Sequence, residues 1–137
     1  MTRPQIAPRG EEKLYFSALA DGNLTYGFCL VCSTSHFYPR TLCPNCHSDD
    51  IESRVGSGRG TIYSFTTQYR AGNPALEDQV PYTIVMVDLD EGYRMMADLV
   101  GSEPEAISIG LPVVAEIEHP DNEHPVVHFR VEVSDGR

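Results

Sequence analysis

The sequence lacks any long hydrophobic run and has few basic residues. None of its apolar stretches approaches the roughly 18 to 20 residues that a membrane span requires, and no apolar leader segment follows Met1. We therefore expect a soluble, cytoplasmic protein. Its 10 lysines and arginines stand against 20 aspartates and glutamates. Binding that depends on neutralising the phosphates of a nucleic acid is disfavoured by this balance.

The length and the distribution of charge bound the architecture. A chain of 137 residues can bury one modest core, so we expect one domain with a small stapled module attached. The acidity is concentrated from residue 76 onward, where 14 acidic residues face three arginines. Between residues 26 and 75 the balance is reversed, because four arginines outnumber the acidic residues there: Arg40, Arg54, Arg59 and Arg70.

All the cysteines fall in two Cys-x-x-Cys pairs with ten residues between the pairs: Cys29, Cys32, Cys43 and Cys46. Thiols stay reduced in the cytoplasm, and two such pairs present four thiolates to a tetrahedral ion. We predict a structural zinc site, because four sulfur ligands leave no open position for water or substrate. A rubredoxin-like iron site, and hence electron transfer, uses the same ligands and stays open as an alternative. His36 and His47 lie nearby and are weaker ligand candidates.

The pattern along the rest of the chain is mainly β. Residues 11–21 have apolar residues at helical spacing, with Gly22 as a stop, and residues 24–28 alternate like a short strand. The cysteine module then ends in a polar stretch, residues 47–52. Five further strands are predicted by β-branched and aromatic enrichment or by alternation: 61–70, 82–89, 93–100, 112–118 and 125–133.

Five strands with short connections, a glycine-marked first strand and a longer link before the fourth favour an OB-like barrel, because a closed sheet has no exposed edges. An SH3-like barrel and an open sandwich fit the pattern too. We predict three parts: residues 1–25 as an N-terminal arm and helix, 26–53 as a zinc ribbon, and 54–137 as an OB-fold domain.

In their order and spacing, the segments FCLVC, LCPNCHS, GRGTIYSFTTQYR and PYTIVMVDLDEGYRMMADLVG resemble the family known as domain of unknown function 35 (DUF35). The resemblance covers nearly the whole chain. It implies a mainly β fold: an N-terminal helix and a rubredoxin-like zinc ribbon, followed by a five-stranded OB-fold barrel associated with acyl-CoA. The four cysteines match the ligands of the family, whereas Ser33 stands where the first knuckle often has glycine.

The resemblance also implies a partner role. Such proteins are similar to small subunits that accompany thiolases, thiolase-like acyltransferases, lipid-transfer-type aldolases and hydroxymethylglutaryl-CoA synthase. The companion enzyme would carry the catalytic cysteine and histidine, and the two chains would form a hetero-oligomer. The OB domain would help to form the channel for the pantetheine arm of acyl-CoA, and the ribbon would dock the partner.

No catalytic set is visible in this chain. A nucleophile needs a base within hydrogen-bond reach and a group that holds the oxyanion, but the cysteines are assigned to the metal and no serine or lysine motif for acyl transfer occurs. We expect that the chain is not an enzyme on its own. The histidines near the last strand are interpreted as solvated or packed side chains: His119, His124 and His128.

Binding residues are proposed from charge and position. Arginine matches phosphate oxygens, so Arg40, Arg54, Arg59 and Arg70 are candidates for contacts with the phosphates of coenzyme A. The alternative is that they are surface charges paired with nearby carboxylates. We also expect the hairpin between the cysteine pairs to present four residues to a partner: His36, Phe37, Tyr38 and Arg40.

A stripe of aromatic residues alternates along the first long strand: Tyr63, Phe65 and Tyr69. Such a stripe is either part of the core, the wall of a pocket or a contact with a partner. It also keeps open a second function, a zinc-ribbon/OB protein that binds single-stranded nucleic acid, because aromatic residues on OB folds stack with bases. The charge balance argues against that function.

Overall fold

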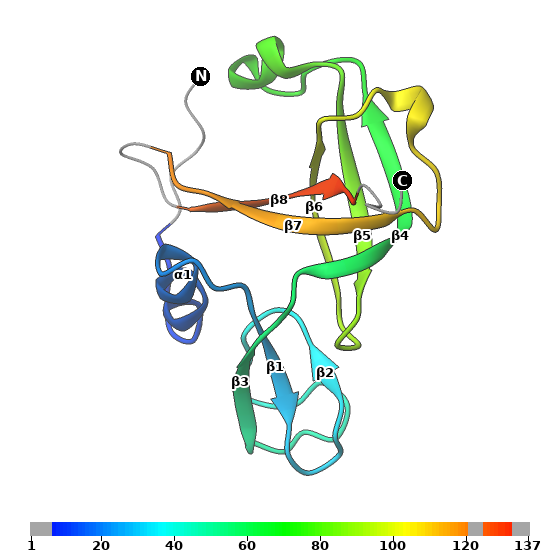
Figure 1. The fold of residues 1–137 in the computed structure, drawn as a ribbon. Coiled ribbons are helices and arrows are strands. Elements are labelled where there is room, and N and C mark those ends of the chain that lie inside the picture. Colours follow the sequence, from blue (N-terminus) through cyan, green and yellow to red (C-terminus); the bar gives the residue numbers. More distant parts are fainter. Residues whose placement is uncertain (1–6, 121–124, 133–137) are drawn as a thin grey trace.

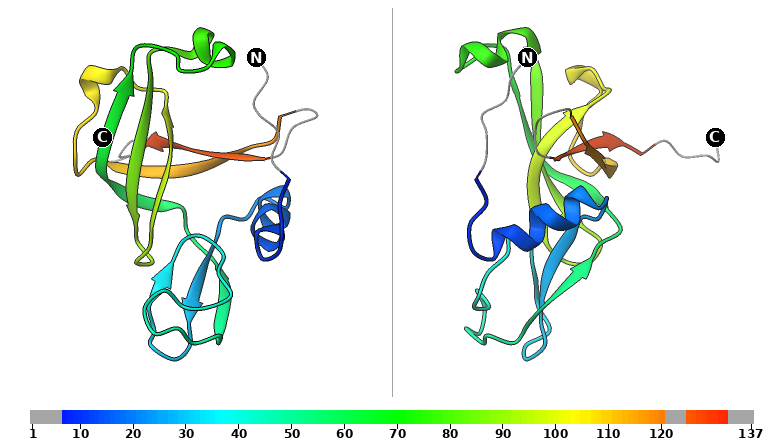
Figure 2. Two further views of the ribbon diagram at one scale, coloured as in Figure 1. Left: turned by 180° about the vertical axis from the view of Figure 1, so that it is seen from behind. Right: turned by 90° about the vertical axis from the view of Figure 1, so that its left-hand side faces the viewer.

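The computed structural model describes residues 7–120 and 125–132. Figure 1 shows a small three-stranded sheet at one end, a five-stranded barrel at the other, and a helix beside their junction. The two further views confirm that the small sheet projects from one end of the barrel (Figure 2). Within the described ranges, no helix combines the length and the apolar character needed to cross a membrane.

The helix α1 (Glu12–Ala20) follows the apolar spacing of the sequence. Tyr15 and Leu19 lie one turn apart, and both are buried. The helix ends where Gly22 adopts a φ of +88° and its N–H bonds to the carbonyl of Leu19 at 2.9 Å. Glycine adopts this left-handed conformation without a steric penalty, so the predicted stop is confirmed.

The small sheet has the order β2-β1-β3 and is antiparallel: β1 (Thr25–Cys29), β2 (Ser35–His36) and β3 (Ile51–Val55). Strand β3 pairs with β1 along its whole length, from Thr25 opposite Val55 to Cys29 opposite Ile51. We did not predict β3, because three of the five residues in its sequence IESRV are polar and they show no clear alternation.

The barrel is closed in the order β4-β5-β6-β8-β7. Its strands match the five predicted ones: β4 (Arg59–Gln68), β5 (Tyr82–Leu89), β6 (Arg94–Val100), β7 (Pro112–Glu118) and β8 (Val126–Val131). Among the described strands of the barrel, β6 and β8 pair in parallel and the other neighbours are antiparallel. Two short 3-10 segments lie in the connections, η1 (Pro74–Gln79) and η2 (Pro104–Ala106). The closed barrel confirms the OB-fold prediction over the open sandwich.

The barrel core is formed by the inward side chains of the strands. Alternate residues of β5 are buried, and Phe129 of β8 fills the centre with no exposed surface. Glycine is required at position 60, where β4 pairs with the end of β5, because a Cβ there would overlap the backbone of Asp88.

An aromatic stack joins the small sheet to the barrel. Tyr93, the residue before β6, is stacked on Tyr26 of β1 at a centroid distance of 4.8 Å and on Phe37 at 6.0 Å. Phe37 in turn meets the ring of Tyr15 on α1 edge to face at 5.4 Å. Such pairs contribute about 0.5–1.5 kcal/mol each beyond the area that they bury. The ribbon, the helix and the barrel therefore share one apolar cluster.

Candidate metal centre

The four cysteine sulfurs form a compact group at the far end of the small sheet. All four Sγ atoms lie within 4.8 Å of one another. The Sγ atoms of Cys29 and Cys46 are 3.6 Å apart, and those of Cys32 and Cys43 are 3.7 Å apart. Four sulfurs bound to a tetrahedral zinc at about 2.3 Å would be about 3.8 Å apart, whereas a disulfide needs about 2.05 Å. The donor set fits a zinc ion and does not form disulfides.

The two knuckles are built by the same backbone pattern. The carbonyl oxygen of Cys29 accepts a bond from the N–H of Ser33, and that of Cys43 from the N–H of His47, both at 2.9 Å. Ser33 has a φ of +61° and His47 a φ of +66°. These are left-handed conformations that favour glycine. Ser33, which stands where the first knuckle often has glycine, therefore lies at a strained position.

Backbone amides point at the sulfurs and prepare them to carry charge. The N–H of Cys32 donates to Cys29 Sγ at 3.4 Å. Cys43 Sγ accepts two such bonds, from the N–H of Asn45 at 3.3 Å and from that of Cys46 at 3.5 Å. Hydrogen bonds to the charged form of an acid favour that form. The knuckles thus stabilise thiolates, the form in which cysteine binds a metal.

The thiols differ in acidity when no cation is present. Hydrogen bonds from the Asn45 side chain and the Thr34 hydroxyl lower the pKa of Cys32 to about 5. At Cys46 the backbone bond from Ser48 acts in the same direction, but burial and the three neighbouring thiols outweigh it and raise the pKa to about 12. Four thiolates at this spacing repel one another, so a dication is needed for all four to ionise together.

His36 and Phe37 do not face outward as expected. His36 is only 9% exposed, and neither of its ring nitrogens has a hydrogen-bond partner among the described residues. Its ring lies against Gly27, where a Cβ would overlap it. Burial lowers the pKa of His36 and keeps the ring neutral. The expectation of a partner contact was wrong for His36, which is buried. Phe37 is half-buried and stacked on Tyr93, and its contact with a partner stays a prediction.

Tyr38 and Arg40 do lie on the surface, as expected. The Tyr38 hydroxyl bonds to the carboxylate of Glu12 on α1 at 3.2 Å. Arg40 lies at a small pocket of about 110 Å³ between α1 and the ribbon, which His36 and Tyr15 also line. This pocket places a cationic group beside the two unpartnered nitrogens of His36.

The four arginines are dispersed over the molecule. Arg54 lies over the ring of Phe28 at 3.8 Å and bonds to Glu52 at 2.5 Å. Arg59 forms an ion pair with Glu132. Arg70 follows the end of β4, about 35 Å further along an extended strand than Arg59. No one phosphate group can contact all four residues, and two of them already have carboxylate partners.

The histidines of the last strands have separate surroundings. His128 lies 3.0 Å from a carboxylate oxygen of Glu116, which also accepts bonds from Arg130. Arg130 and His128 hold the pKa of Glu116 below its ordinary value. His119 is exposed, and His124 lies outside the described residues.

A four-sulfur cage on a small sheet, joined to a closed five-stranded barrel, defines a zinc-ribbon/OB-fold protein. Two family models match the chain in this order: the rubredoxin-like zinc ribbon domain of ChsH2 at residues 16–52, and the C-terminal OB-fold domain of ChsH2 at residues 54–118. The chain belongs to the DUF35 family, in which a zinc ribbon precedes an OB fold.

Three similar proteins are parts of CoA enzymes or aldolases. A solved structure named Ltp2-ChsH2(DUF35) aldolase is 33% identical with a TM-score of 0.82, covering 96% of this chain and 100% of that one. The probable enoyl-CoA hydratase alpha subunit of Thermomonospora curvata is 34% identical over 93% of this chain. Benzoylsuccinyl-CoA thiolase subunit BbsA of Thauera aromatica is 33% identical over 62% of it. The chain spans 40% of the hydratase subunit and 59% of the thiolase subunit.

Proposed function

We propose that this chain is an accessory subunit of a thiolase or thiolase-like acyl-CoA enzyme complex, and that it does not catalyse the reaction itself. The observation that carries the proposal is the closed four-sulfur cage. The small sheet that holds the cage is joined to the OB barrel by the stacked rings of Tyr26 and Tyr93. The chain also matches the Ltp2-ChsH2(DUF35) aldolase structure over 96% of its length. The subunit roles in the names of the relatives support it.

The metal in this proposal is a structural zinc, held by Cys29, Cys32, Cys43 and Cys46. The ion would supply charge balance for four thiolates and would fix the two knuckles to each other. With four sulfur ligands it has no free position for a substrate. The contribution of the site is therefore a rigid surface.

The knuckles supply that surface. Leu30 and Val31 lie between the first two cysteines, Leu42 precedes the second pair, and all three are exposed. Apolar side chains on a rigid support bind a partner without losing much conformational freedom. We propose that these residues, with Tyr38, contact the enzyme subunit, since His36 is buried and Phe37 is half-buried against the core.

Contact with CoA is assigned first to Arg40. Arg40 is exposed and lies beside the pocket that contains the unpartnered nitrogens of His36, whereas Arg54 and Arg59 are engaged by Glu52 and Glu132. A guanidinium matches phosphate oxygens in geometry as well as charge. Arg70 remains the second candidate, and the barrel is proposed to help form the pantetheine channel.

Co-expression tests this proposal. The chain is produced together with a thiolase-like protein from the same genome, and the mixture is separated by size-exclusion chromatography with light scattering. We expect one hetero-oligomeric peak, and we expect the double variant Leu30→Asp and Leu42→Asp to elute separately while it retains its metal. If the wild-type proteins elute separately and the enzyme is fully active alone, the proposal is wrong.

A further inference from the structure

The second half of β4 is an open edge of the barrel. Strand β7 pairs with β4 only from Arg59 to Thr61, and Ile62 bonds to the backbone of Gly110 and Leu111. From Tyr63 to Gln68, the backbone bonds only to β5 among the described residues. Five residues of β4, 64–68, are thus paired with β5 on one side, and on the other side no described strand pairs with them.

The register shows which peptide groups face the open side. Arg59 directs its carbonyl toward the β5 hairpin, where the N–H of Asp90 donates to it, and Ile62 directs its N–H and carbonyl the other way. In an antiparallel ladder these directions alternate, and the bulge between Ile62 and Ser64 shifts the alternation by one residue. The N–H and C=O groups of Phe65 and Thr67 therefore point away from β5.

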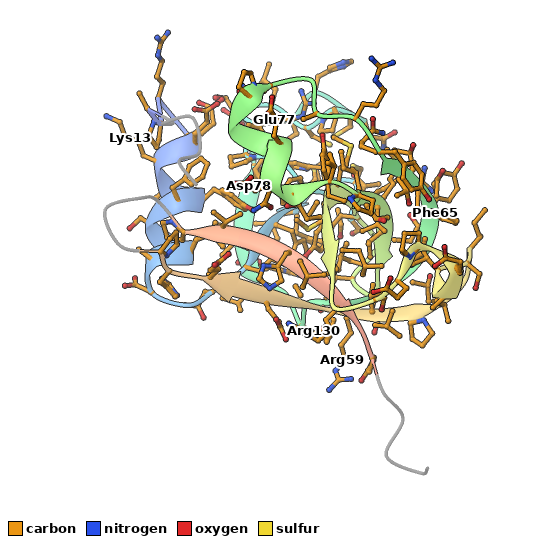
Figure 3. All side chains as sticks on the ribbon, turned by 90° about the horizontal axis from the view of Figure 1, so that it is seen from above. Lys13, Arg59, Phe65, Glu77, Asp78 and Arg130 are labelled. Carbon is orange, nitrogen blue, oxygen red and sulfur yellow. The ribbon has the colours of Figure 1, made fainter. Side chains whose placement is uncertain are left out.

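The side chains of this edge are uncharged, and three exposed aromatic rings lie along it. Tyr63 is 49% exposed, Phe65 36% and Tyr69 65%, so the aromatic stripe is not part of the core. Figure 3 shows Phe65 at the outer margin of the barrel. No charged residue and no proline occurs from Thr61 to Tyr69, in a chain with a net charge of −10.

Sheet edges of monomeric proteins are normally protected by a charge, a proline or a covering segment. Two features protect the start of this edge: the bulge, and Arg94, whose guanidinium lies 3.6 Å from the centre of the Tyr63 ring. The ladder with β5 continues beyond both to Gln68. An uncovered edge of this length and composition would promote aggregation. The open groups of this edge are therefore available to another polypeptide.

We propose that an extended, uncharged segment of the partner enzyme adds to β4 as a further strand. This assignment rests on the proposed function for the identity of the partner. Its main chain would exchange four hydrogen bonds with Phe65 and Thr67, and its side chains would cover Tyr63 and Phe65. A polypeptide fits better than a nucleic acid, because the open groups alternate as strand donors and acceptors. The cation over Tyr63, Arg94, already forms an ion pair with Asp88.

Two substitutions of Phe65 distinguish the contribution of its backbone to binding from the contribution of its side chain. Phe65→Pro removes one N–H on the open side and leaves the ladder with β5 intact, since proline is tolerated at sheet edges. Phe65→Ala loses the same ring and keeps the N–H. We expect Phe65→Pro to bind the thiolase-like subunit about tenfold more weakly than Phe65→Ala. The proline variant loses one hydrogen bond and leaves the carbonyl of the partner segment without a donor. The dissociation constants are measured by calorimetry on zinc-loaded chains with equal melting temperatures.

A second pair of variants keeps the test decisive if Phe65→Pro does not fold. Thr66→Lys places a charge on the exposed face of the edge strand. Met96→Lys places one on the exposed face of β6, which β5 separates from β4. We expect only Thr66→Lys to weaken binding. Equal affinities within each pair would overturn the edge assignment and leave the proposed function intact, whereas a wild-type chain that binds no enzyme subunit would contradict both. A homodimer of the chain alone that Phe65→Pro abolishes would assign the edge to a second copy, and would also overturn the proposal.

Discussion

Replacement of Cys43 by serine removes one corner of the sulfur cage. Cys43 is 1% exposed, lies 3.7 Å from Cys32 Sγ, and accepts the N–H bonds of Asn45 and Cys46. Structural zinc contributes about 10–16 kcal/mol in small zinc modules, so one ligand of four corresponds to about 3 to 4 kcal/mol. Two weakened amide bonds add about 1 kcal/mol in total. The expected loss approaches the whole stability of a marginal domain, about 5 kcal/mol.

The assay for Cys43→Ser combines metal analysis with thermal unfolding. We expect the purified variant to contain less than one zinc per chain and to melt at least about 10 °C lower than the wild type, since 1 kcal/mol shifts the midpoint by a few degrees in a chain of this size. His47→Asn is the matched control, because residue 47 lies next to the cage without joining it and asparagine accepts a positive φ. A Cys43→Ser chain that keeps one zinc and its melting temperature would refute the reasoning.

Further predictions concern strain, packing, acidity and metal identity. Ser33→Gly should raise the free energy of unfolding by about 0.5–1 kcal/mol, because relief of the left-handed backbone at φ +61° exceeds the entropy cost of glycine; urea unfolding checks the sign, and a loss would contradict it. Phe37→Ala should cost about 3 kcal/mol by removing the ring between Tyr15 and Tyr93; a loss below 1 kcal/mol would deny the stack a structural role. The folded-state pKa of His36 is depressed, so its neutral form contributes stability above pH 6.5 that is lost as the pH falls below that value; melting curves of His36→Gln should show a shallower decline from pH 7 to 5 than the wild type, and parallel curves would refute this. The purified chain should be colourless with one zinc; a red protein with iron absorption bands would instead support the rubredoxin-type alternative.

The sequence predicted the barrel well because its strands are long and strongly patterned. Strand β5 alternates buried and half-buried residues from Tyr82 to Leu89, and Gly92 takes a φ of +97° in the predicted hairpin turn. The cysteine spacing likewise brought four sulfurs within metal-binding distance. Local features of this kind are visible in the order of the residues.

Features that depend on tertiary pairing were missed. Strand β3 has little apolar character and is held by its ladder with β1. The inward position of His36 and Phe37 follows from Gly27, which leaves room for the imidazole, and from Tyr93, which lies far along the chain. Arg59 and Arg70 are close in the sequence but far apart in space, because β4 runs between them from one end of the barrel to the other.

The central claim, that this chain serves a CoA enzyme as a zinc-stiffened accessory subunit, is tested most directly by turnover. The thiolase-like subunit is assayed on a panel of acyl-CoA thioesters alone, with the wild-type chain, and with Cys43→Ser. We predict that the wild-type chain raises turnover at least about tenfold, that Cys43→Ser does not, and that the chain alone has no activity. Full activity of the enzyme subunit without this chain, unchanged when the chain is added, would contradict the account.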